Sequence, residues 1–270
     1  MMQAQNAEIA ETEFTCFARS AYEWKAVTAA LQSIAEDVSF EVDANGVRSR
    51  AMDPSHVALL EISISSKAFE KFACSRPTRF TTHLEDFSKI VKRADSKESI
   101  EISRANSNGA LSMKIGSGHY RKEFELHLME TDLKSSPLPK LNFTTRFKMD
   151  LGSFYQILMD VSTLSTYLTV IVRPDRVILS GKGDSGNVEV TLGKNQSGLL
   201  QEIEILGERD ETKALYNLEY LLKLVKSMTP YSDIITFEYA TKMPLKMEFA
   251  IGNKEGNGKI QYFLAPKIVD

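Results

Sequence analysis

Four segments of the chain repeat one spacing of apolar residues, at relative positions 0, 3, 7 and 10, which is the stripe of an amphipathic helix. The four stripes are Trp24, Val27, Leu31 and Ile34 in a helix expected over residues 21–36, then Leu84, Phe87, Val91 and Ala94, then Leu151, Phe154, Leu158 and Val161, and last Leu218, Leu221, Val225 and Met228. Each stripe covers only one narrow face. We therefore expect each helix to pack one side against a sheet and to leave the other side polar.

Between the stripes, apolar and polar residues alternate over short runs, the pattern of half-buried strands. These runs are residues 38–42, 47–52, 56–65, the positions around Ile100 and Ile102, 111–115, 120–128, 168–172, 176–180, 187–192, 234–239, 245–251 and 260–264. Asn45-Gly46 suits a tight hairpin turn, and Pro174-Asp175 marks another turn. Many strands joined by turns, with few helices, predict an α+β fold of mainly antiparallel sheet covered by helices on one side.

The chain contains an internal repeat. Residues 84–92 and 218–226 share Leu, Glu, Lys, Val and Lys at a constant offset of 134 residues, nearly half of the 270-residue chain. Between them, Pro137 and Pro139 cannot lie inside a helix or a central strand, which predicts an extended connector over residues 129–143. We therefore expect two similar domains, each with antiparallel sheet and two helices, at 14–128 and 144–270, preceded by a disordered tail at 1–13.

Composition limits the classes of function. The net charge is -3, from 33 basic and 36 acidic residues, which argues against a uniformly basic nucleic-acid binder but allows a segregated basic face. Cys16 and Cys74 lie far apart without CxxC spacing, as expected for reduced thiols of an intracellular protein. The first thirteen residues lack the apolar core of a signal peptide, and no run approaches the 18 apolar residues of a membrane span.

No pattern in the sequence gives positive evidence for catalysis. The four histidines, His56, His83, His119 and His127, have no ligand spacing with cysteines or carboxylates, so we expect no metal site. The glycine-rich residues 181–186 lack the order of a phosphate-binding loop and a following helix, so they predict a turn between strands. No serine or cysteine stands in a nucleophile signature. We therefore expect no catalytic residue and no cofactor.

The second and fourth expected helices carry the same charged pattern opposite their apolar stripes. One has Glu85, Lys89 and Lys92, and the other has Glu219, Lys223 and Lys226. On one helix alone this would be an ordinary solvated face with an i,i+4 ion pair. Because the pattern recurs in both halves, it favours sequence-independent attraction to phosphates. These faces lack interleaved aromatics for base stacking, which favours duplex over single strands.

Three separated motifs occur in an order that resembles the sliding clamp family of proliferating cell nuclear antigen: AMDPSHVAL at 51–59, the connector between like halves, and YFLAPKI at 262–268. The resemblance runs from about residue 14 to residue 270, and the short connector and loops look archaeal. It implies a DNA clamp fold, a two-domain subunit of which three close a ring around duplex DNA, with helices lining the hole and sheets outside. It also implies a non-catalytic processivity factor for DNA polymerase that recruits replication and repair enzymes, located at the nucleoid of an archaeon or in the nucleus of a eukaryote.

Basic residues of the inner ring surface carry over by position to Lys25, Lys89, Lys92 and Lys226, and helical spacing adds Arg93 and Lys223. The chain departs from the family on the third helix, where Gln156, Met159 and Thr163 occupy sites that can be basic in relatives, and at Glu219 on the fourth helix. We therefore expect weaker DNA contact from the second domain.

The partner site of the family is a hydrophobic pocket that accepts the aliphatic and aromatic anchors of a short peptide. Its residues carry over to Met52, His56 and Leu59 on one wall, Leu138, Pro139 and Phe143 on the connector, and Pro244, Tyr262, Leu264, Ala265 and Pro266 at the floor and C-terminal side. Backbone near Ala265 is expected to hydrogen-bond a leading glutamine, whereas Ser136 replaces a larger apolar residue at the upper edge. The implied partners are DNA polymerase, clamp loader, flap endonuclease and DNA ligase.

Two expected strands with clean alternation, 120–128 and 187–193, are candidates for exposed sheet edges. By the family's geometry they pair head to tail between neighbouring subunits of a homotrimer, with Tyr120, Phe124, Leu126, Val188 and Val190 at the interface. Two other hypotheses for the function stay open at this point. One is a clamp-like subunit of a hetero-oligomeric ring, and the other is a two-domain enzyme with an unrecognised site in a cleft.

Overall fold

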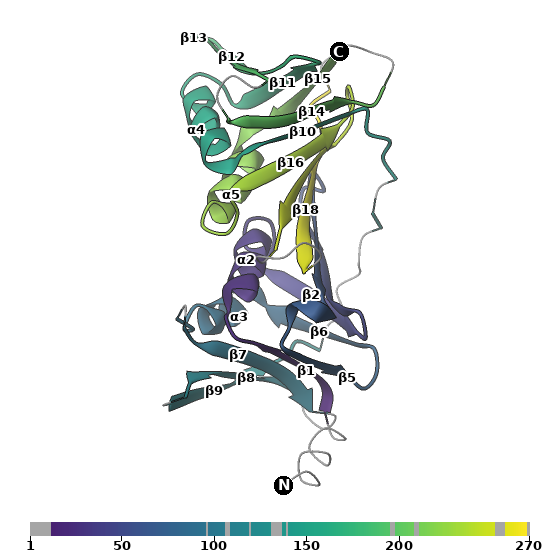
Figure 1. The fold of residues 1–270 in the computed structure, drawn as a ribbon, viewed down its shortest axis with the longest axis vertical. Coiled ribbons are helices and arrows are strands. Elements are labelled where there is room, and N and C mark those ends of the chain that lie inside the picture. The colour runs from purple at the N-terminus through teal and green to yellow at the C-terminus, as the bar shows by residue number, and fades with distance from the viewer. Residues whose placement is uncertain are drawn as a thin grey trace. The chain divides into compact units, whose positions relative to one another are not determined.

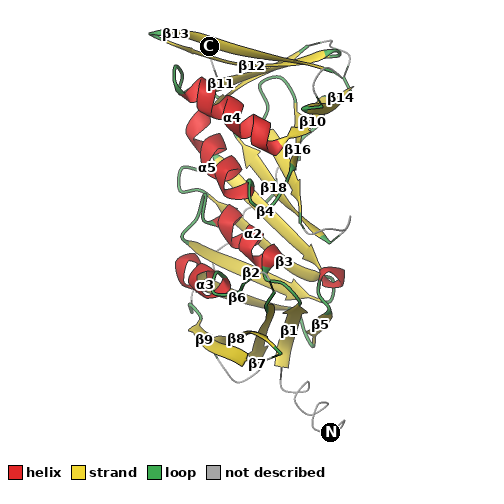
Figure 2. Ribbon diagram, turned by 60° about the vertical axis from the view of Figure 1, so that its left-hand side comes forward, coloured by secondary structure: helices red, strands yellow, loops and turns green. Residues whose placement is uncertain are grey.

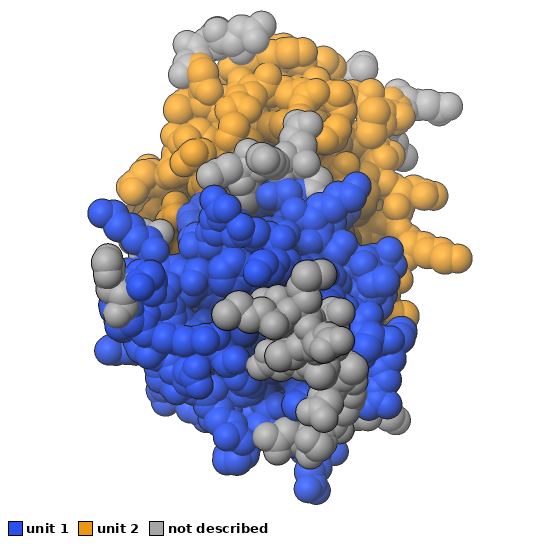
Figure 3. Space-filling view, turned by 60° about the horizontal axis from the view of Figure 1, so that its bottom comes forward, with its two compact units in different colours: residues 1–51, 61–136, 250–260 blue, residues 52–60, 137–249, 261–270 orange. Residues whose placement is uncertain are grey.

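The structure, a computed structural model, describes residues 12–95, 97–105, 109–118, 120–130, 137–138, 140–194, 198–207, 211–251 and 257–268. Its contacts divide the chain into two compact units, coloured separately in Figure 3. Unit 1 comprises residues 1–51, 61–136 and 250–260, and unit 2 comprises residues 52–60, 137–249 and 261–270. Among the described residues, no helix is long and apolar enough to cross a membrane.

Each half of the chain contains the same order of elements. The first half runs β1 (Thr12–Ala18), α2 (Tyr22–Leu31), β2 (Asp37–Asp43), β3 (Gly46–Met52), β4 (Ala58–Ser65), the short 3-10 helix η1 (Ser66–Ala68), β5 (Lys71–Cys74), β6 (Thr78–His83), α3 (Leu84–Val91), β7 (Ser99–Ala105), β8 (Ala110–Ser117) and β9 (Tyr120–His127). The second half runs β10 (Thr145–Asp150), α4 (Leu151–Ser162), β11 (Tyr167–Arg173), β12 (Arg176–Gly183), β13 (Gly186–Gly193), β14 (Leu200–Ile205), β15 (Thr212–Asn217), α5 (Leu218–Met228), β16 (Ile234–Tyr239), β17 (Leu245–Ala250) and β18 (Gly258–Leu264) (Figure 1). Apart from η1 the two orders match element for element, so the repeat predicted from the sequence is confirmed.

The strands form antiparallel sheet within each unit. In unit 1, five strands lie in the order β5-β1-β7-β8-β9, and in unit 2, four strands lie in the order β13-β12-β11-β15. Two further runs are β4-β3-β2-β6 and β14-β10-β16-β17-β18. β9 and β13 each end a sheet, as the sequence predicted for these two runs.

The four helices lie where the apolar stripes predicted them, in pairs that cover one face of sheet in each unit (Figure 2). Every residue of the four stripes is buried, and the largest exposed fraction among them is 8%, at Ile34. In unit 1, Trp24 of α2 contacts Phe87 of α3 and Phe40 of β2, with ring centroids 5.6 and 5.9 Å apart. In unit 2, Phe154 of α4 packs edge-on against Phe237 of β16 at 4.8 Å. The stripes are therefore the surfaces that join the helices to the sheets.

The end of α2 and the start of β1 differ from the prediction. α2 ends at Leu31, not near residue 36, because Ser33 and Ile34 donate their N–H groups only three residues back, to Ala30 and Leu31. Ile34 nevertheless remains buried, so the predicted apolar stripe extends into the turn that follows the helix. β1 begins at Thr12, inside the tail predicted at 1–13, whose first eleven residues lie outside the described part of the chain.

The hairpin at Asn45-Gly46 is confirmed with a turn one residue earlier than predicted. Asp43 pairs with Gly46, so Ala44 and Asn45 are the turn residues and Gly46 begins β3. Gly46 has a φ of +140°, and a Cβ there would lie 2.0 Å from the Ile64 carbonyl oxygen. The glycine is required by close backbone approach as well as by its φ angle.

Candidate functional site

The turn between β3 and β4 is built around the buried carboxylate of Asp53. Its Oδ1 accepts the N–H groups of Val57 (2.7 Å) and Ala58 (2.6 Å), and its Oδ2 accepts the N–H of Ser55 (3.0 Å). The backbone closes the same turn, since the Asp53 N–H donates to Ala58 and the His56 N–H donates to Asp53. These bonds hold His56 at a φ of +59°, in the left-handed region that non-glycine residues seldom adopt.

A residue far along the chain completes this arrangement. The Tyr220 hydroxyl, from the first turn of α5, donates to Asp53 Oδ2 at 2.8 Å. Burial acts to raise the pKa of Asp53, but the hydrogen bonds from Ala58, Tyr220, Ser55 and Val57 outweigh it and lower the pKa. Asp53 is therefore held as an ionised acceptor at neutral pH. Sequence reasoning missed both residues: the Asp-Pro pair signals an Asx-type turn at Asp53, whereas nothing in the sequence points to Tyr220.

The C-terminal segment after β18 lies against the same turn. The Ala265 N–H donates to the Val57 carbonyl at 2.9 Å, and the Lys267 N–H donates to Leu215 of β15 at 2.7 Å. The Lys267 ammonium lies 3.7 Å from the centroid of the Tyr167 ring. Because the Ala265 N–H is already used, a bound glutamine would have to engage another backbone group of this segment.

The residues proposed for the peptide pocket that the structure describes all belong to unit 2, where they differ in exposure. His56 and Leu138 are exposed, and Met52, Phe143, Pro244, Ala265 and Pro266 are half-buried. Leu59, Tyr262 and Leu264 are buried at 5% exposure or less, so their side chains offer a bound peptide little area. Pro139 and Ser136 lie outside the described residues.

The Tyr262 hydroxyl is a buried polar group among these candidate residues. It has no hydrogen-bond partner among the described residues. Burial raises its pKa, and the nearby Asp53 and Tyr220 add to the shift. A buried donor without an acceptor is costly, so this hydroxyl is suited to bind a water molecule or a ligand group.

The candidate DNA-facing cations of unit 1 lie on α2, α3 and the turn after α3. Lys25 is half-buried and donates to the Ala94 carbonyl at 2.5 Å. Lys89 pairs with Glu85 at 2.7 Å, and Lys92 donates to Gln32 at 3.2 Å. Arg93 is exposed, and its guanidinium makes no hydrogen bond or ion pair with the described residues.

In unit 2 the candidates lie on α5. Lys223 pairs with Glu219 at 2.9 Å, which raises the pKa of its ammonium. Lys226 is exposed in the last turn and has no side-chain partner in the described part of the chain. Gln156 and Met159 on α4, and Thr163 directly after it, are exposed and carry no charge. Of the six candidate cations, only Arg93 and Lys226 are unengaged within the described structure.

The candidate interface strands present alternating side chains. On β9, Tyr120 is 52% exposed, and Phe124 and Leu126 are half-buried. On β13, Val188 and Val190 are half-buried. The start of β9 is tied to the loop after α3, because Glu98 accepts hydrogen bonds from the Tyr120 hydroxyl, the Lys122 ammonium (3.0 Å) and the Asp95 N–H (2.8 Å). These bonds, led by that from Tyr120, lower the pKa of Glu98 to about 2.

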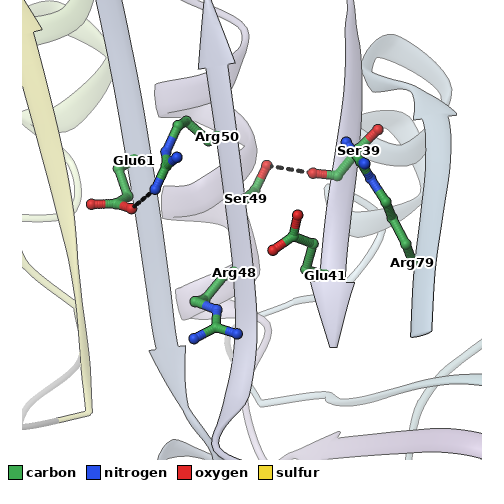
Figure 4. Close-up of a pocket in the computed structure, with 7 residues that line it drawn as sticks. All are labelled: Ser39, Glu41, Arg48, Ser49, Arg50, Glu61 and Arg79. Carbon is green, nitrogen blue, oxygen red and sulfur yellow. Dashed lines mark hydrogen bonds and ion pairs between the residues drawn. The ribbon is translucent and has the colours of Figure 1, made fainter. Parts of the chain in front are cut away.

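Unit 1 also contains a polar hollow of about 230 Å³ that the sequence did not indicate (Figure 4). It is lined by Ser39, Glu41, Arg48, Ser49, Arg50, Glu61 and Arg79. Arg50 pairs with Glu61, and Arg48 pairs with Asp43, each at 2.5 Å. Glu41 lies directly opposite both Arg48 and Arg79 on the neighbouring strands. Arg50 is thus paired with a carboxylate of the lining and Arg48 with Asp43 outside it, so these two guanidiniums belong to ion pairs between neighbouring strands.

Family models match nearly the whole chain. Residues 17–136 match the N-terminal domain, and residues 137–267 the C-terminal domain, of proliferating cell nuclear antigen. The DNA polymerase sliding clamp of Nitrosopumilus maritimus is 36% identical over 244 residues, covering 90% of this chain and 94% of the relative, and that of Cenarchaeum symbiosum is 35% identical with the same coverage.

A crystal structure of PCNA from Thermococcus kodakaraensis shares the fold. Its TM-score is 0.86 at 21% identity, over 94% of this chain and 100% of the other. With the repeated element order, the antiparallel sheets and the sequence matches, these findings place the chain in the proliferating cell nuclear antigen family of DNA polymerase sliding clamps.

Proposed function

We propose that this chain, a sliding clamp by its family, closes with two further copies into a ring around duplex DNA and tethers DNA polymerase there. The ring has no chemistry of its own and acts as a processivity factor and recruiting platform. It engages the polymerase, a clamp loader, a flap endonuclease and a DNA ligase through short peptides. Its place of action is the DNA of the cell, which is the nucleoid in an archaeon.

The proposed assembly rests on two pairs of strands that correspond in the repeat, since one strand of each pair has a neighbour within the chain and the other ends a sheet. In the repeat, β4 corresponds to β13 and β18 corresponds to β9. β4 and β18 are hydrogen-bonded neighbours, with Ser65 N–H donating to Asn257 in unit 1 and Ala265 N–H donating to Val57 in unit 2. Their counterparts β13 and β9 both end a sheet without a partner strand among the described residues. A second copy supplies the missing pair, β9 against β13, in the manner already used within the chain.

The partner surface is the part of unit 2 that carries Leu138, Phe143 and His56. Leu138 supplies exposed apolar area on the connector, and the 53–58 turn supplies the opposite wall. A peptide with aliphatic and aromatic anchors can bury this area, since apolar anchors in desolvated pockets dominate such interfaces. Tyr262, Leu264 and Leu59 keep the floor rigid from below.

Two measurements test this function. Light scattering on the purified chain should give a particle of three subunits. A stable monomer would contradict the homotrimer and favour a ring with non-identical partners. Once loaded on closed circular duplex, the protein should remain bound in high salt, whereas a linear duplex with open ends should lose it by sliding. Equal retention on circular and linear duplex would refute encirclement.

A further inference from the structure

We infer that Tyr220 is a positioning residue for the partner-peptide surface, because its hydroxyl fixes the Asp53 carboxylate on which both the 53–58 turn and the C-terminal segment depend. This inference rests on the proposed peptide surface. It goes beyond that proposal by assigning a role to a residue of α5, which the sequence linked only to DNA through Lys223 and Lys226.

A continuous set of hydrogen bonds runs from α5 to the C-terminal segment. Tyr220 donates to Asp53 Oδ2, and Asp53 Oδ1 accepts the Val57 N–H. The Val57 carbonyl in turn accepts the Ala265 N–H. One hydroxyl on the helix is thus connected, through one carboxylate, to both the 53–58 turn and the C-terminal segment of the proposed peptide surface.

Among the described residues, the Tyr220 bond is the one hydrogen bond to the Asp53 carboxylate that does not come from the turn itself. The three N–H donors belong to Ser55, Val57 and Ala58, which move with the turn. Asp53 is only 4% exposed, so its carboxylate cannot replace a lost donor freely with water. Without the hydroxyl, the turn keeps its internal bonds but loses its anchor to the rigid helix. His56, held at positive φ within that turn, is the exposed side chain whose placement depends on the anchor.

The variant Tyr220→Phe removes this one hydroxyl and keeps the ring. The pKa of Asp53 in this variant tests the positioning role, because few ionisable groups surround Asp53. Tyr220 from α5 donates to Asp53, and Tyr262 from β18 lies close enough for the Asp53 charge to raise its pKa. Lys223 lies one turn along α5 and acts on Tyr220. In the parent, the bonds to ionised Asp53 are lost only as pH falls through its lowered pKa. In Tyr220→Phe that pKa should rise, so the turn should loosen at a higher pH.

The experiment combines peptide binding with backbone dynamics. Calorimetry uses a glutamine-led peptide that ends in paired aromatics, and hydrogen exchange is followed at the Val57, Ala58 and Ala265 amides. In Tyr220→Phe we expect peptide affinity to fall by up to about 10-fold, since the lost bond is to a charged group, and these three amides to exchange faster. The Asp53 carboxyl, followed by NMR titration, should ionise at a higher pH than in the parent. Asp53→Asn, combined with Tyr220→Phe, should add little beyond the larger single effect.

Tyr155→Phe on α4 is the matched control, because it also removes one hydroxyl from a helix of unit 2 and should change none of these readouts. If the parent binds the peptide and Tyr220→Phe binds it equally well, the positioning role is overturned while the surface stands. If the parent binds no such peptide, the proposed surface itself fails, and the role of Tyr220 falls with it.

Discussion

Replacing Lys226 with alanine should weaken the salt-sensitive attraction of the clamp for DNA more than replacing any paired lysine. Lys226 is exposed in the last turn of α5 and has no ion pair in the described structure, whereas Lys223 pairs with Glu219 at 2.9 Å and Lys89 with Glu85 at 2.7 Å. A paired lysine must exchange one anion for another when it meets a phosphate. An unengaged lysine exchanges only water and counterions, so it contributes its whole charge.

The size of the effect follows from counterion release. Each phosphate contact contributes about 0.9 to the slope of log K against log salt, so between 50 and 200 mM salt each contact accounts for about a 3.5-fold loss of affinity. Lys226→Ala should remove one such factor for every subunit whose Lys226 touches the duplex. Glu219→Gln should act in the opposite direction, because it frees Lys223 for contact with phosphate.

Fluorescence anisotropy with a labelled duplex, measured across that salt range, gives both affinity and slope. Lys182→Ala is the control, since Lys182 is an exposed lysine on β12 and not on a helix. Thermal unfolding of each variant confirms that the fold is intact. An unchanged slope in Lys226→Ala, or an equal reduction in Lys182→Ala, would refute the assignment of the DNA-facing surface.

Three further predictions concern other parts of the molecule. Leu138→Ala should weaken peptide binding by about 1 to 3 kcal/mol, or roughly 5-fold to 150-fold, while Lys92→Ala should leave it unchanged in calorimetry. N–H groups alternate in direction along a strand, so either Glu189→Pro or Val190→Pro should remove a donor that points out from β13. That variant should give folded monomers in light scattering, and trimers from both variants would refute β13 as the interface strand. Glu98→Gln should lower the melting temperature at pH 7, and the difference from the parent should shrink as pH falls from about 4.5 toward 2, because Glu98 is stabilised in its ionised form; a difference that is constant with pH would contradict this.

The helices and the repeat could be predicted from the sequence because their signals are local. A stripe such as Leu151, Phe154, Leu158 and Val161 needs only a few turns of chain to be recognised, and burial of a continuous apolar face fixes its orientation. The strands β2 and β13 were found for the same reason, since apolar and polar residues alternate throughout each. Six strands were missed: β1, β5, β6, β10, β14 and β15. β5 has only four residues, and in β15 the apolar residues 214–216 are consecutive and do not alternate with polar ones.

The contacts that shape the candidate sites could not be predicted, because they join residues far apart in sequence. Tyr220 and Asp53 are 167 positions apart, and the Lys25 ammonium is bound to a carbonyl 69 positions away. Helical spacing placed Lys25 on a polar face correctly as a surface position. It could not show that this charge would be used to hold the end of α3.

That use of lysines inside the subunit bears on how the clamp holds DNA. Lys25 and Lys122 donate to the Ala94 and Arg93 carbonyls, just beyond the end of α3, where cations also oppose the negative end of the helix dipole. Lys89 and Lys223 are neutralised by glutamates one turn away. Of the six candidate cations, Arg93 and Lys226 are therefore the two left unengaged among the described residues, so the helices offer few of these charges to phosphates. Attraction of this strength suits a ring that must slide, because every additional phosphate contact would have to be broken at each step along the duplex. In the proposed assembly, retention on DNA comes from closure through β9 and β13, and the basic residues only centre the duplex within the ring.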